Sequence, residues 1–415
     1  MTNLALLFPG QGSQFTGMGR SWFESESSVR ERFDQASEIV GYSLADLCFT
    51  GPASELTRTR HAQVALLVLS FGMYEVISRD RRLPVTHMAG HSLGEITALL
   101  AAGAMGFEDA VRLVKVRGEA MEACTTAGDT GMIAALRTPA AQVEKWAEEF
   151  NSDGHAVQVA NYNAEQQTVL AGTLEELRGM AGLLEERGAR VAWLNVAGAF
   201  HSTHMADAVP AYAAEIGRIG FTEPTVPVCS TVTGRVYESV EEIRGALSEQ
   251  LTSPVRWDAV MSTLTADGVG LWIEVGPKNV LGKMVAGAVE DARAHSLGED
   301  AEGTYAALDR AIEERRNRPG LVGLCLGAAA ATRNRNFDDD EYASGVIAPY
   351  RRLQELASTE DEELTDAGKR EALDLLRTIM GTKGVPEAEQ RERITSILRR
   401  TGDSALLEPT GGAVS

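Results

Sequence analysis

The sequence has little cysteine, and its cysteines form no recognisable pattern. Cys48, Cys124, Cys229 and Cys325 are the only four in 415 residues, and they lie far apart. Such spacing fits neither a disulfide framework nor a metal knuckle. We therefore expect reduced core thiols, no bound metal, and a cytoplasmic protein.

Positive charge is also scarce, because 39 Lys and Arg stand against 59 Asp and Glu, a formal net charge of −20. This surface would repel nucleic acid, so we expect no nucleic-acid partner. An acidic protein partner would need a local basic cluster, although ordinary solvated surface also explains such clusters. The candidates are Arg315-Arg316-Asn317-Arg318 and Arg333-Asn334-Arg335.

Long apolar runs and a leader are missing as well. The N-terminal residues lack the basic segment and cleavage site of a signal peptide. No run approaches the roughly 18 apolar residues that span a membrane. We expect no membrane association.

What the sequence does contain is 44% hydrophobic residues and 41 glycines, enough for a sizeable core with many tight turns. Its length favours two or three domains. Strand-like runs and helical periodicities alternate along the chain. Buried strands are predicted at 4–8 and 86–90, and helices at 62–77, 95–102 and 109–124.

Residues 128–195 show a different order of elements. Strands are predicted at 132–136, 156–162, 167–171 and 191–195, and helices at 140–150 and 174–186. The order βαββαβ is typical of a ferredoxin-like subdomain. Helical and strand patterns then resume at 205–219, 226–231, 241–251, 255–265 and 271–275.

The last quarter of the chain is predicted to be mainly helical. A polar, acidic stretch at 290–303 is expected to end the first unit. Charged helical residues continue to about residue 400, and 405–415 has the small, polar composition of a frayed tail.

Gly90-His91-Ser92-Leu93-Gly94 matches the G-x-S-x-G nucleophile elbow. A serine on a sharp strand-to-helix turn has strained backbone angles, and its neighbours must lack bulk. The following helix directs free N–H groups at the site, which favours a developing oxyanion. The context agrees, because an apolar stretch precedes Ser92 and an alanine-rich helix follows. Ser92 is therefore the predicted nucleophile of an α/β unit.

A partial copy of the elbow surrounds Ser296. His295-Ser296-Leu297-Gly298-Glu299 repeats the core letters, but Ala294 replaces the first glycine. Acidic residues follow it instead of an apolar helix. We predict only a structural role for Ser296.

Two glycine-containing stretches approach nucleotide-binding loops but fail in detail. Phe15 stands where a dinucleotide fingerprint from Gly10 needs glycine, and the stretch from Gly276 to Lys283 is one residue too long for a P-loop. We expect no bound cofactor. Because glycines allow close backbone approach, the turn at Gly10 instead offers a second donor for an oxyanion hole.

Six motifs together resemble the malonyl-CoA:acyl-carrier-protein transacylase family in order and spacing, over residues 4–290. They are Phe8-Pro9-Gly10-Gln11-Gly12-Ser13-Gln14, the Ser92 elbow, Lys115-Val116-Arg117-Gly118, Gly198-Ala199-Phe200-His201-Ser202, Pro254-Val255-Arg256-Trp257 and Glu274-Val275-Gly276-Pro277. Later motifs resemble the segment after the catalytic core in discrete, trans-acting acyltransferases of modular polyketide synthases. These are Thr332-Arg333-Asn334-Arg335-Asn336, Glu341-Tyr342, Gly345-Val346 and Pro349-Tyr350-Arg351-Arg352.

The resemblance implies a role for each site residue. Ser92 would carry the acyl group as an ester, and His201 would move the proton. The main-chain carbonyl of Gln250 would orient the imidazole in place of a carboxylate. The N–H groups of Gln11 and Leu93 would form the oxyanion hole.

The implied substrate-binding residues are Arg117, Gln63, Phe200, His91 and Asn161. Residue patterns alone leave alternatives open. Gln63 reads as a solvated helix residue and Asn161 as ordinary turn polarity, while His204 competes with His201 as the base.

Arg117 would set the substrate class. Its place in a helix alone suggests a surface ion pair, but the resemblance implies that it grips the free carboxylate of malonyl through two hydrogen bonds. Such a pair rejects acetyl, since the cation is otherwise left unpaired. Phe200 resembles the malonyl-preferring form of its motif and would fill space that a branched extender needs.

The sequence therefore predicts an α/β-hydrolase-like subdomain at 1–127 and 196–290, a ferredoxin-like subdomain at 128–195, a post-catalytic segment at 304–355 and a helical extension at 356–415. The expected reaction is ping-pong malonyl transfer from CoA through Ser92 to the phosphopantetheine of an acyl carrier protein. Polyketide synthase modules are expected partners of the extension. The alternatives are an editing hydrolase of the same fold, a transferase for a larger extender, and a non-catalytic docking protein.

Overall fold

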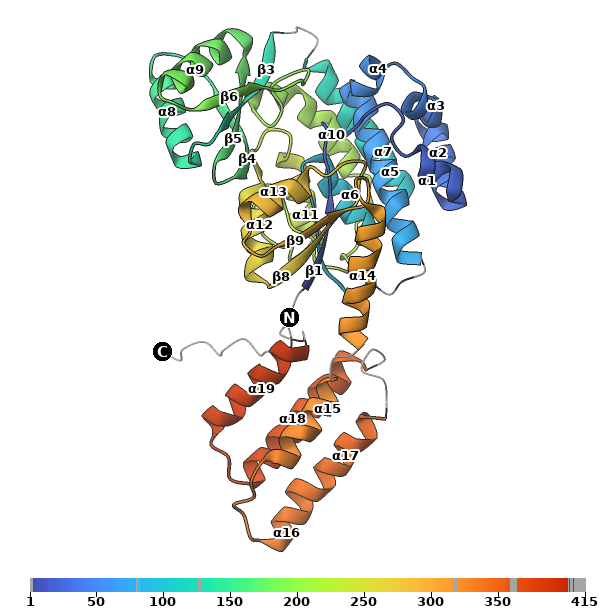
Figure 1. Ribbon diagram of the computed structural model, residues 1–415, viewed down its shortest axis with the longest axis vertical. Coiled ribbons are helices and arrows are strands. Elements are labelled where there is room, and N and C mark those ends of the chain that lie inside the picture. The colour runs from blue at the N-terminus through green and yellow to red at the C-terminus, as the bar shows by residue number, and fades with distance from the viewer. Residues whose placement is uncertain are drawn as a thin grey trace. The chain divides into compact units, whose positions relative to one another are not determined.

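The computed structural model describes residues 3–79, 81, 83–125, 129–316, 320–358, 364–401, 403 and 406. The chain divides into two compact units, residues 2–312 and residues 313–415. Figure 1 labels most elements of both units. Each unit has a hydrophobic core of its own and is described by itself.

Four parallel strands form the central sheet of the first unit, in the order β2-β1-β8-β9. They are β1 (Asn3–Phe8), β2 (Val85–Gly90), β8 (Val269–Glu274) and β9 (Arg293–Ser296). Residues 4–8 are at most 1% exposed, because helices cover both faces of a parallel sheet. Phe8 pairs with Gly90, so the carboxyl ends of β1 and β2 meet at one edge.

The longest helix of the first unit, α5 (Thr59–Arg79), is part of the core. It is the one helix among the described residues that is long and apolar enough to cross a membrane, and 78% of that apolar window is buried. The expectation that no run approaches this length was therefore wrong. Core helices of soluble folds pass the same test because their apolar residues face the protein on all sides.

Apart from the helices named in the next two paragraphs, the other helices of the first unit pack on this sheet or on one another (Figure 1). They are α1 (Arg20–Ser25), α2 (Ser27–Val40), α3 (Leu44–Phe49), α4 (Ala53–Thr57), α6 (Leu93–Ala101), α7 (Phe107–Ala123), η1 (Thr203–Ala208), α10 (Val209–Ile216), α11 (Val240–Glu249), α12 (Trp257–Ala266) and α13 (Leu281–Ala288). Of the four free cysteines, Cys124 is only half-buried, which differs from the predicted core position.

The acidic stretch at 290–303 does not end the first unit. Residues 293–296 form β9, which pairs in parallel with β8 and completes the sheet. α14 (Ala301–Arg316) follows, and its residues Ala307 and Leu308 join the first core. A four-residue edge strand with polar side chains has no apolar alternation, so the sequence pattern did not reveal it.

A second, five-stranded sheet lies in the order β6-β3-β5-β4-β7. Its elements are β3 (Thr130–Leu136), α8 (Ala140–Ser152), β4 (Gln158–Ala164), β5 (Gln167–Thr173), α9 (Leu174–Glu186), β6 (Arg190–Trp193) and β7 (Val255–Arg256). The first six follow the βαββαβ order expected from the sequence. β7 comes from after the insert and pairs in parallel with β4, which ties the insert to the segment following α11.

The second unit contains only helices among its described residues. They are α15 (Leu321–Ala331), α16 (Asp339–Tyr342), the π-helix η2 (Ala343–Ile347), α17 (Ala348–Leu356), α18 (Asp366–Thr382) and α19 (Glu387–Thr401). α18 packs against α15 and α17, and all three contribute to one core. The predicted boundary at residue 355 therefore falls inside one packed unit. The predicted tail at 405–415 lies outside the described residues except for Leu406.

Candidate active site

Ser92 occupies a strained turn between β2 and α6. Its φ is 53° and its ψ is −106°, a region that a residue with a Cβ avoids at a cost of about 1–3 kcal/mol. The flanking glycines make the turn possible. A Cβ on Gly90 would lie 1.9 Å from the backbone of Gly94, and one on Gly94 would lie 1.9 Å from the carbonyl oxygen of Phe8. This tight packing presents the serine at the start of α6.

His201 completes a proton path with Ser92. Ser92 Oγ lies 2.7 Å from His201 Nε2, and His201 Nδ1 lies 2.9 Å from the carbonyl oxygen of Gln250. Gln250 follows the last residue of α11, where helix carbonyls lack intrahelical donors. The imidazole therefore donates from Nδ1 and accepts the serine proton at Nε2. The competitor His204 lies in η1, where its backbone N–H bonds Ser202 Oγ.

Burial and, to a smaller extent, the positive charge of Arg117 together lower the pKa of His201 to about 3, although the Gln250 carbonyl opposes the shift. The imidazole is therefore neutral at physiological pH. A neutral imidazole is the form that accepts a proton from serine.

Arg117 is a buried cation at the nucleophile. Its side chain is 1% exposed, and Nη2 donates to Ser92 Oγ over 3.0 Å. Nη1 donates to Gln63 Oε1, while Nε and Nη2 both donate to Gln250 Oε1. No carboxylate among the described residues forms an ion pair with it. Burial lowers the pKa of Arg117, and Tyr212 and Glu95 oppose the shift. A buried cation with neutral partners suits an anionic ligand.

Gln11 and Leu93 lie at the two loops that border Ser92. Leu93 begins α6, where the helix provides no acceptor for its backbone N–H. Gln11 follows β1 in the turn whose Gly10 packs against His91, where a Cβ would lie 2.5 Å from the His91 carbonyl oxygen. Both residues line the same cavity as Ser92.

This cavity has a volume of about 170 Å³ and is lined by residues from the turns after β1 and β2 and from strands of the second sheet. Of the predicted site residues, the cavity wall contains Ser92, His201, Gln11, Leu93, Arg117, Phe200, His91 and Asn161. Gln63 and Gln250 lie behind Arg117 instead. Gln63 is 1% exposed, so it is neither a solvated residue nor part of the cavity wall. Its side-chain oxygen accepts a hydrogen bond from the Arg117 guanidinium.

Sequence reasoning missed three contributors to the site. Asn163 Oδ1 lies 2.9 Å from His91 Nε2 and lines the cavity. Glu95 is fully buried and accepts a hydrogen bond from Gln250 Nε2. The side chain of Gln250 contacts Arg117, whereas only its carbonyl was predicted to act. An acidic residue in the first turn of a helix is so common that Glu95 gave no distinct signal.

The elbow copy at Ser296 lies in β9, away from the cavity. Ser296 is 2% exposed, and its Oγ donates to the carbonyl oxygen of Lys278. It therefore stabilises the strand end.

Comparison with known proteins identifies the family of this chain. The acyl transferase domain family matches residues 5–310. A malonyl CoA-acyl carrier protein transacylase of Bacillus subtilis is 31% identical over 397 residues, 94% of this chain and 99% of that protein. The polyketide biosynthesis malonyl CoA-acyl carrier protein transacylase PksC of Bacillus subtilis strain 168 is 37% identical over 293 residues, 70% of this chain and 99% of its own length.

A solved complex of a type II polyketide synthase acyl-carrier protein with its malonyl-transacylase is similar in fold. Its matching chain has a TM-score of 0.71 and 33% identity, covering 74% of this chain and 100% of its own. The match includes the α/β architecture that carries the elbow. The chain belongs to the acyl transferase domain family and, within it, to the malonyl CoA-acyl carrier protein transacylases.

Proposed function

We propose that this chain moves a malonyl unit from CoA to Ser92, and then to the phosphopantetheine thiol of an acyl carrier protein, by a ping-pong mechanism. The observation that carries the proposal is one hydrogen-bonded path. It runs from the Gln250 carbonyl through His201 to Ser92 Oγ, with Arg117 donating to the same oxygen.

In the first half-reaction Ser92 Oγ attacks the thioester carbon while His201 Nε2 takes its proton. The N–H groups of Gln11 and Leu93 would stabilise the oxyanion. The C–S bond then breaks, His201 returns the proton to the leaving thiolate, and CoA departs. In the second half the carrier thiol gives its proton to His201 and attacks the ester carbon, the bond from that carbon to Ser92 Oγ breaks, and His201 returns the proton to Ser92 Oγ.

Arg117 would bind the carboxylate of the malonyl group. Arg117 Nη2 donates a hydrogen bond to Ser92 Oγ in the free enzyme. That oxygen becomes a poorer acceptor once it is part of an ester. The substrate carboxylate can replace it there. Phe200 and apolar residues of the second sheet, such as Met132 and Val169, would enclose the rest of the unit and the end of the pantetheine arm. The arm is proposed to enter between the large subdomain and a ferredoxin-like small subdomain.

Initial rates with malonyl-CoA and a pantetheine acceptor test the mechanism. Parallel double-reciprocal lines are expected, because CoA leaves before the acceptor reacts. Lines that intersect would show a ternary complex and overturn the ping-pong proposal.

Phe200→Ala is expected to widen acceptance of α-branched extenders. Phe200 lines the cavity and is 5% exposed, so its removal leaves space beside the base. The ratio of methylmalonyl to malonyl loading should rise about 10- to 100-fold, the usual worth of one methyl-sized difference. The ratio is measured by mass of the acyl-enzyme. Phe71→Ala, another buried ring outside the cavity wall, should leave the ratio unchanged; an unchanged ratio in both variants would refute the steric role.

The helical unit is proposed to dock polyketide synthase modules. Phe337 is 90% exposed and Ile347 is 42% exposed, so both apolar side chains are available to a partner. Arg333 and Arg335 are exposed there too. In the other predicted basic cluster, residues 317 and 318 lie outside the described residues.

The protein is proposed to be cytoplasmic, where the four free thiols stay reduced.

Deletion of residues 313–415 separates docking from catalysis. Transfer to free pantetheine should be unchanged, because the cavity belongs to the first unit. Transfer to the cognate carrier-bearing module should fall about tenfold or more, since a second contact raises the effective concentration. Both rates are measured side by side on the same preparation. Equal loss on both acceptors would mean that the helical unit serves folding alone.

A further inference from the structure

Glu95 is a fully buried carboxylate that lies behind the active site and does not line the cavity. Its oxygens accept hydrogen bonds from Thr231 N over 3.2 Å, Thr231 Oγ1 over 2.5 Å, Gln250 Nε2 over 2.6 Å and the Tyr237 hydroxyl. Burial raises the pKa of Glu95, and these hydrogen bonds oppose the rise. Burying a charged side chain costs folding free energy even when the side chain is fully hydrogen-bonded. A neutral residue at position 95 would therefore cost less if only packing were needed there.

The Gln250 amide lies between Glu95 and Arg117. Its Nε2 donates to Glu95 Oε2 and, over 3.1 Å, to the carbonyl oxygen of Ser92. Its Oε1 accepts from Arg117 Nε over 3.2 Å and from Nη2 over 2.9 Å. An amide has two ends of nearly equal size, and only its partners decide which end faces which way. A carboxylate accepts only and a guanidinium donates only, so these two neighbours allow one orientation.

We propose that Glu95 is a positioning residue for malonyl selection. Glu95 holds the Gln250 amide with the amide oxygen toward Arg117. That oxygen accepts a hydrogen bond from Arg117 Nε, and the guanidinium is thereby held with Nη2 directed at Ser92 Oγ. The inference rests on the proposed function, in which Arg117 binds the malonyl carboxylate. With an amide at position 95, which has a donor as well as an acceptor, the orientation of the Gln250 amide is no longer fixed, and its NH₂ group can turn to oppose the donors of Arg117.

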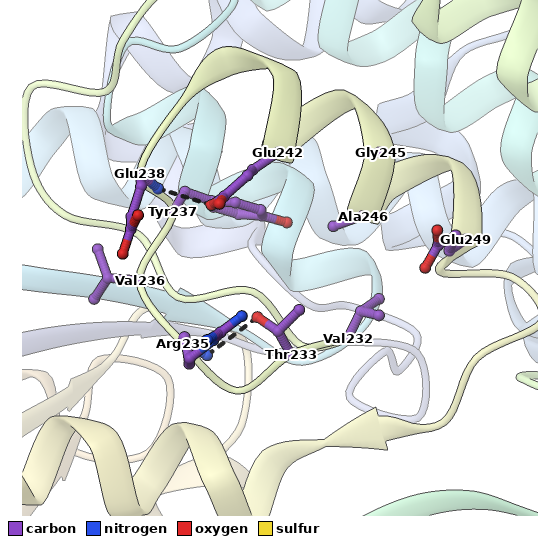
Figure 2. A pocket seen from close by; sticks show the side chains of 10 residues that line it. All are labelled: Val232, Thr233, Arg235, Val236, Tyr237, Glu238, Glu242, Gly245, Ala246 and Glu249. Carbon is purple, nitrogen blue, oxygen red and sulfur yellow. Dashed lines mark hydrogen bonds between the residues drawn. The ribbon is translucent and has the colours of Figure 1, made fainter.

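Tyr237 forms the outer end of this arrangement. It is one of the residues that line a surface pocket of about 430 Å³, and Figure 2 shows its ring beneath α11. Burial raises the pKa of Tyr237 well above its usual range, so the hydroxyl stays a donor to Glu95. Tyr237→Phe removes one of the donors to Glu95 and leaves the ring, which provides a milder perturbation of the same path.

The test compares malonyl and acetyl loading of Ser92 on each enzyme preparation, because a ratio cancels differences in the folded fraction. Glu95→Gln should lower the malonyl-to-acetyl ratio about 10- to 100-fold, the worth of one hydrogen bond to a charged group. Tyr237→Phe should lower it less. Glu274→Gln is the matched control: Glu274 is also fully buried but bonds the backbone N–H of Gly282 at the start of α13, so the ratio should not change.

A double-mutant cycle separates positioning from general packing. Gln250→Met keeps the carbonyl that faces His201 but removes the amide. If Glu95 acts through that amide, adding Glu95→Gln to Gln250→Met should change the ratio no further, although each change alone lowers it. Multiplicative effects, or an unchanged ratio in Glu95→Gln, would overturn the inference. Absence of any malonyl adduct on the unmodified enzyme would instead overturn the proposed function.

Discussion

Arg117→Ala is expected to lower malonyl loading of Ser92 about 10²- to 10⁴-fold, while acetyl loading changes far less. Two charge-assisted hydrogen bonds to a carboxylate, each worth ~1.5–3 kcal/mol, account for a loss of this size. Arg117 is buried, and no ion-pair partner is found for it in the described part of the chain. The rates are measured by intact mass of the acyl-enzyme with each acyl-CoA.

Arg117→Lys is the matched control for charge. A lysine keeps the positive charge but lacks the planar pair of donors, so its loss should be intermediate. A malonyl-to-acetyl ratio that stays the same in Arg117→Ala would remove Arg117 from substrate selection. In that case the editing hydrolase and unselective acyltransferases would have to be reconsidered.

His201→Ala is expected to slow formation of the acyl-enzyme about 10²- to 10⁴-fold, the usual contribution of a general base. The reason is geometric, since Nε2 lies 2.7 Å from the serine oxygen. His204→Ala, which alters the neighbouring histidine, should load at the normal rate. If His204→Ala were the slow variant, the base would be misassigned.

The pH dependence of loading provides an independent check on His201. Its pKa is lowered to about 3, so the free enzyme keeps the imidazole neutral from mildly acidic to neutral pH. The value of kcat/KM should therefore stay level through pH 6.5, the usual pKa of histidine, and fall only in stronger acid. Below pH 6.5 His201 binds a proton in the unfolded chain but not in the folded state. The same pKa shift therefore lowers the free energy of unfolding as the pH falls from 6.5 toward 3. A titration of kcat/KM centred near 6.5 would contradict the buried, neutral imidazole.

The sequence predicted the elements whose signals are local. α9 begins and ends where predicted, because Thr173 and Glu176 form a capping box ahead of an amphipathic run. The elbow was equally predictable from the sequence, since the turn requires two glycines for steric reasons and follows an apolar strand. The mainly helical character of the described residues beyond 303 was also predicted.

What the sequence could not reveal depends on contacts between distant segments. Gln63 reads as solvated on its helix, yet Arg117 lies against it from 54 positions away. Glu95 and Gln250 are 155 positions apart, and neither residue type indicates the other. The edge strand at 293–296 and the shared core of the helical unit likewise arise only from tertiary packing.

Ser92 is proposed to carry a malonyl ester that a pantetheine thiol, rather than water, discharges. The direct measurement is intact mass of the enzyme after incubation with malonyl-CoA, followed by removal of CoA and addition of a carrier protein or of buffer. We expect one malonyl adduct, absent in Ser92→Ala, that persists in buffer and disappears with the carrier protein as the carrier gains the same mass. Rapid loss of the adduct in buffer alone, or an adduct that survives in Ser92→Ala, would contradict the proposal.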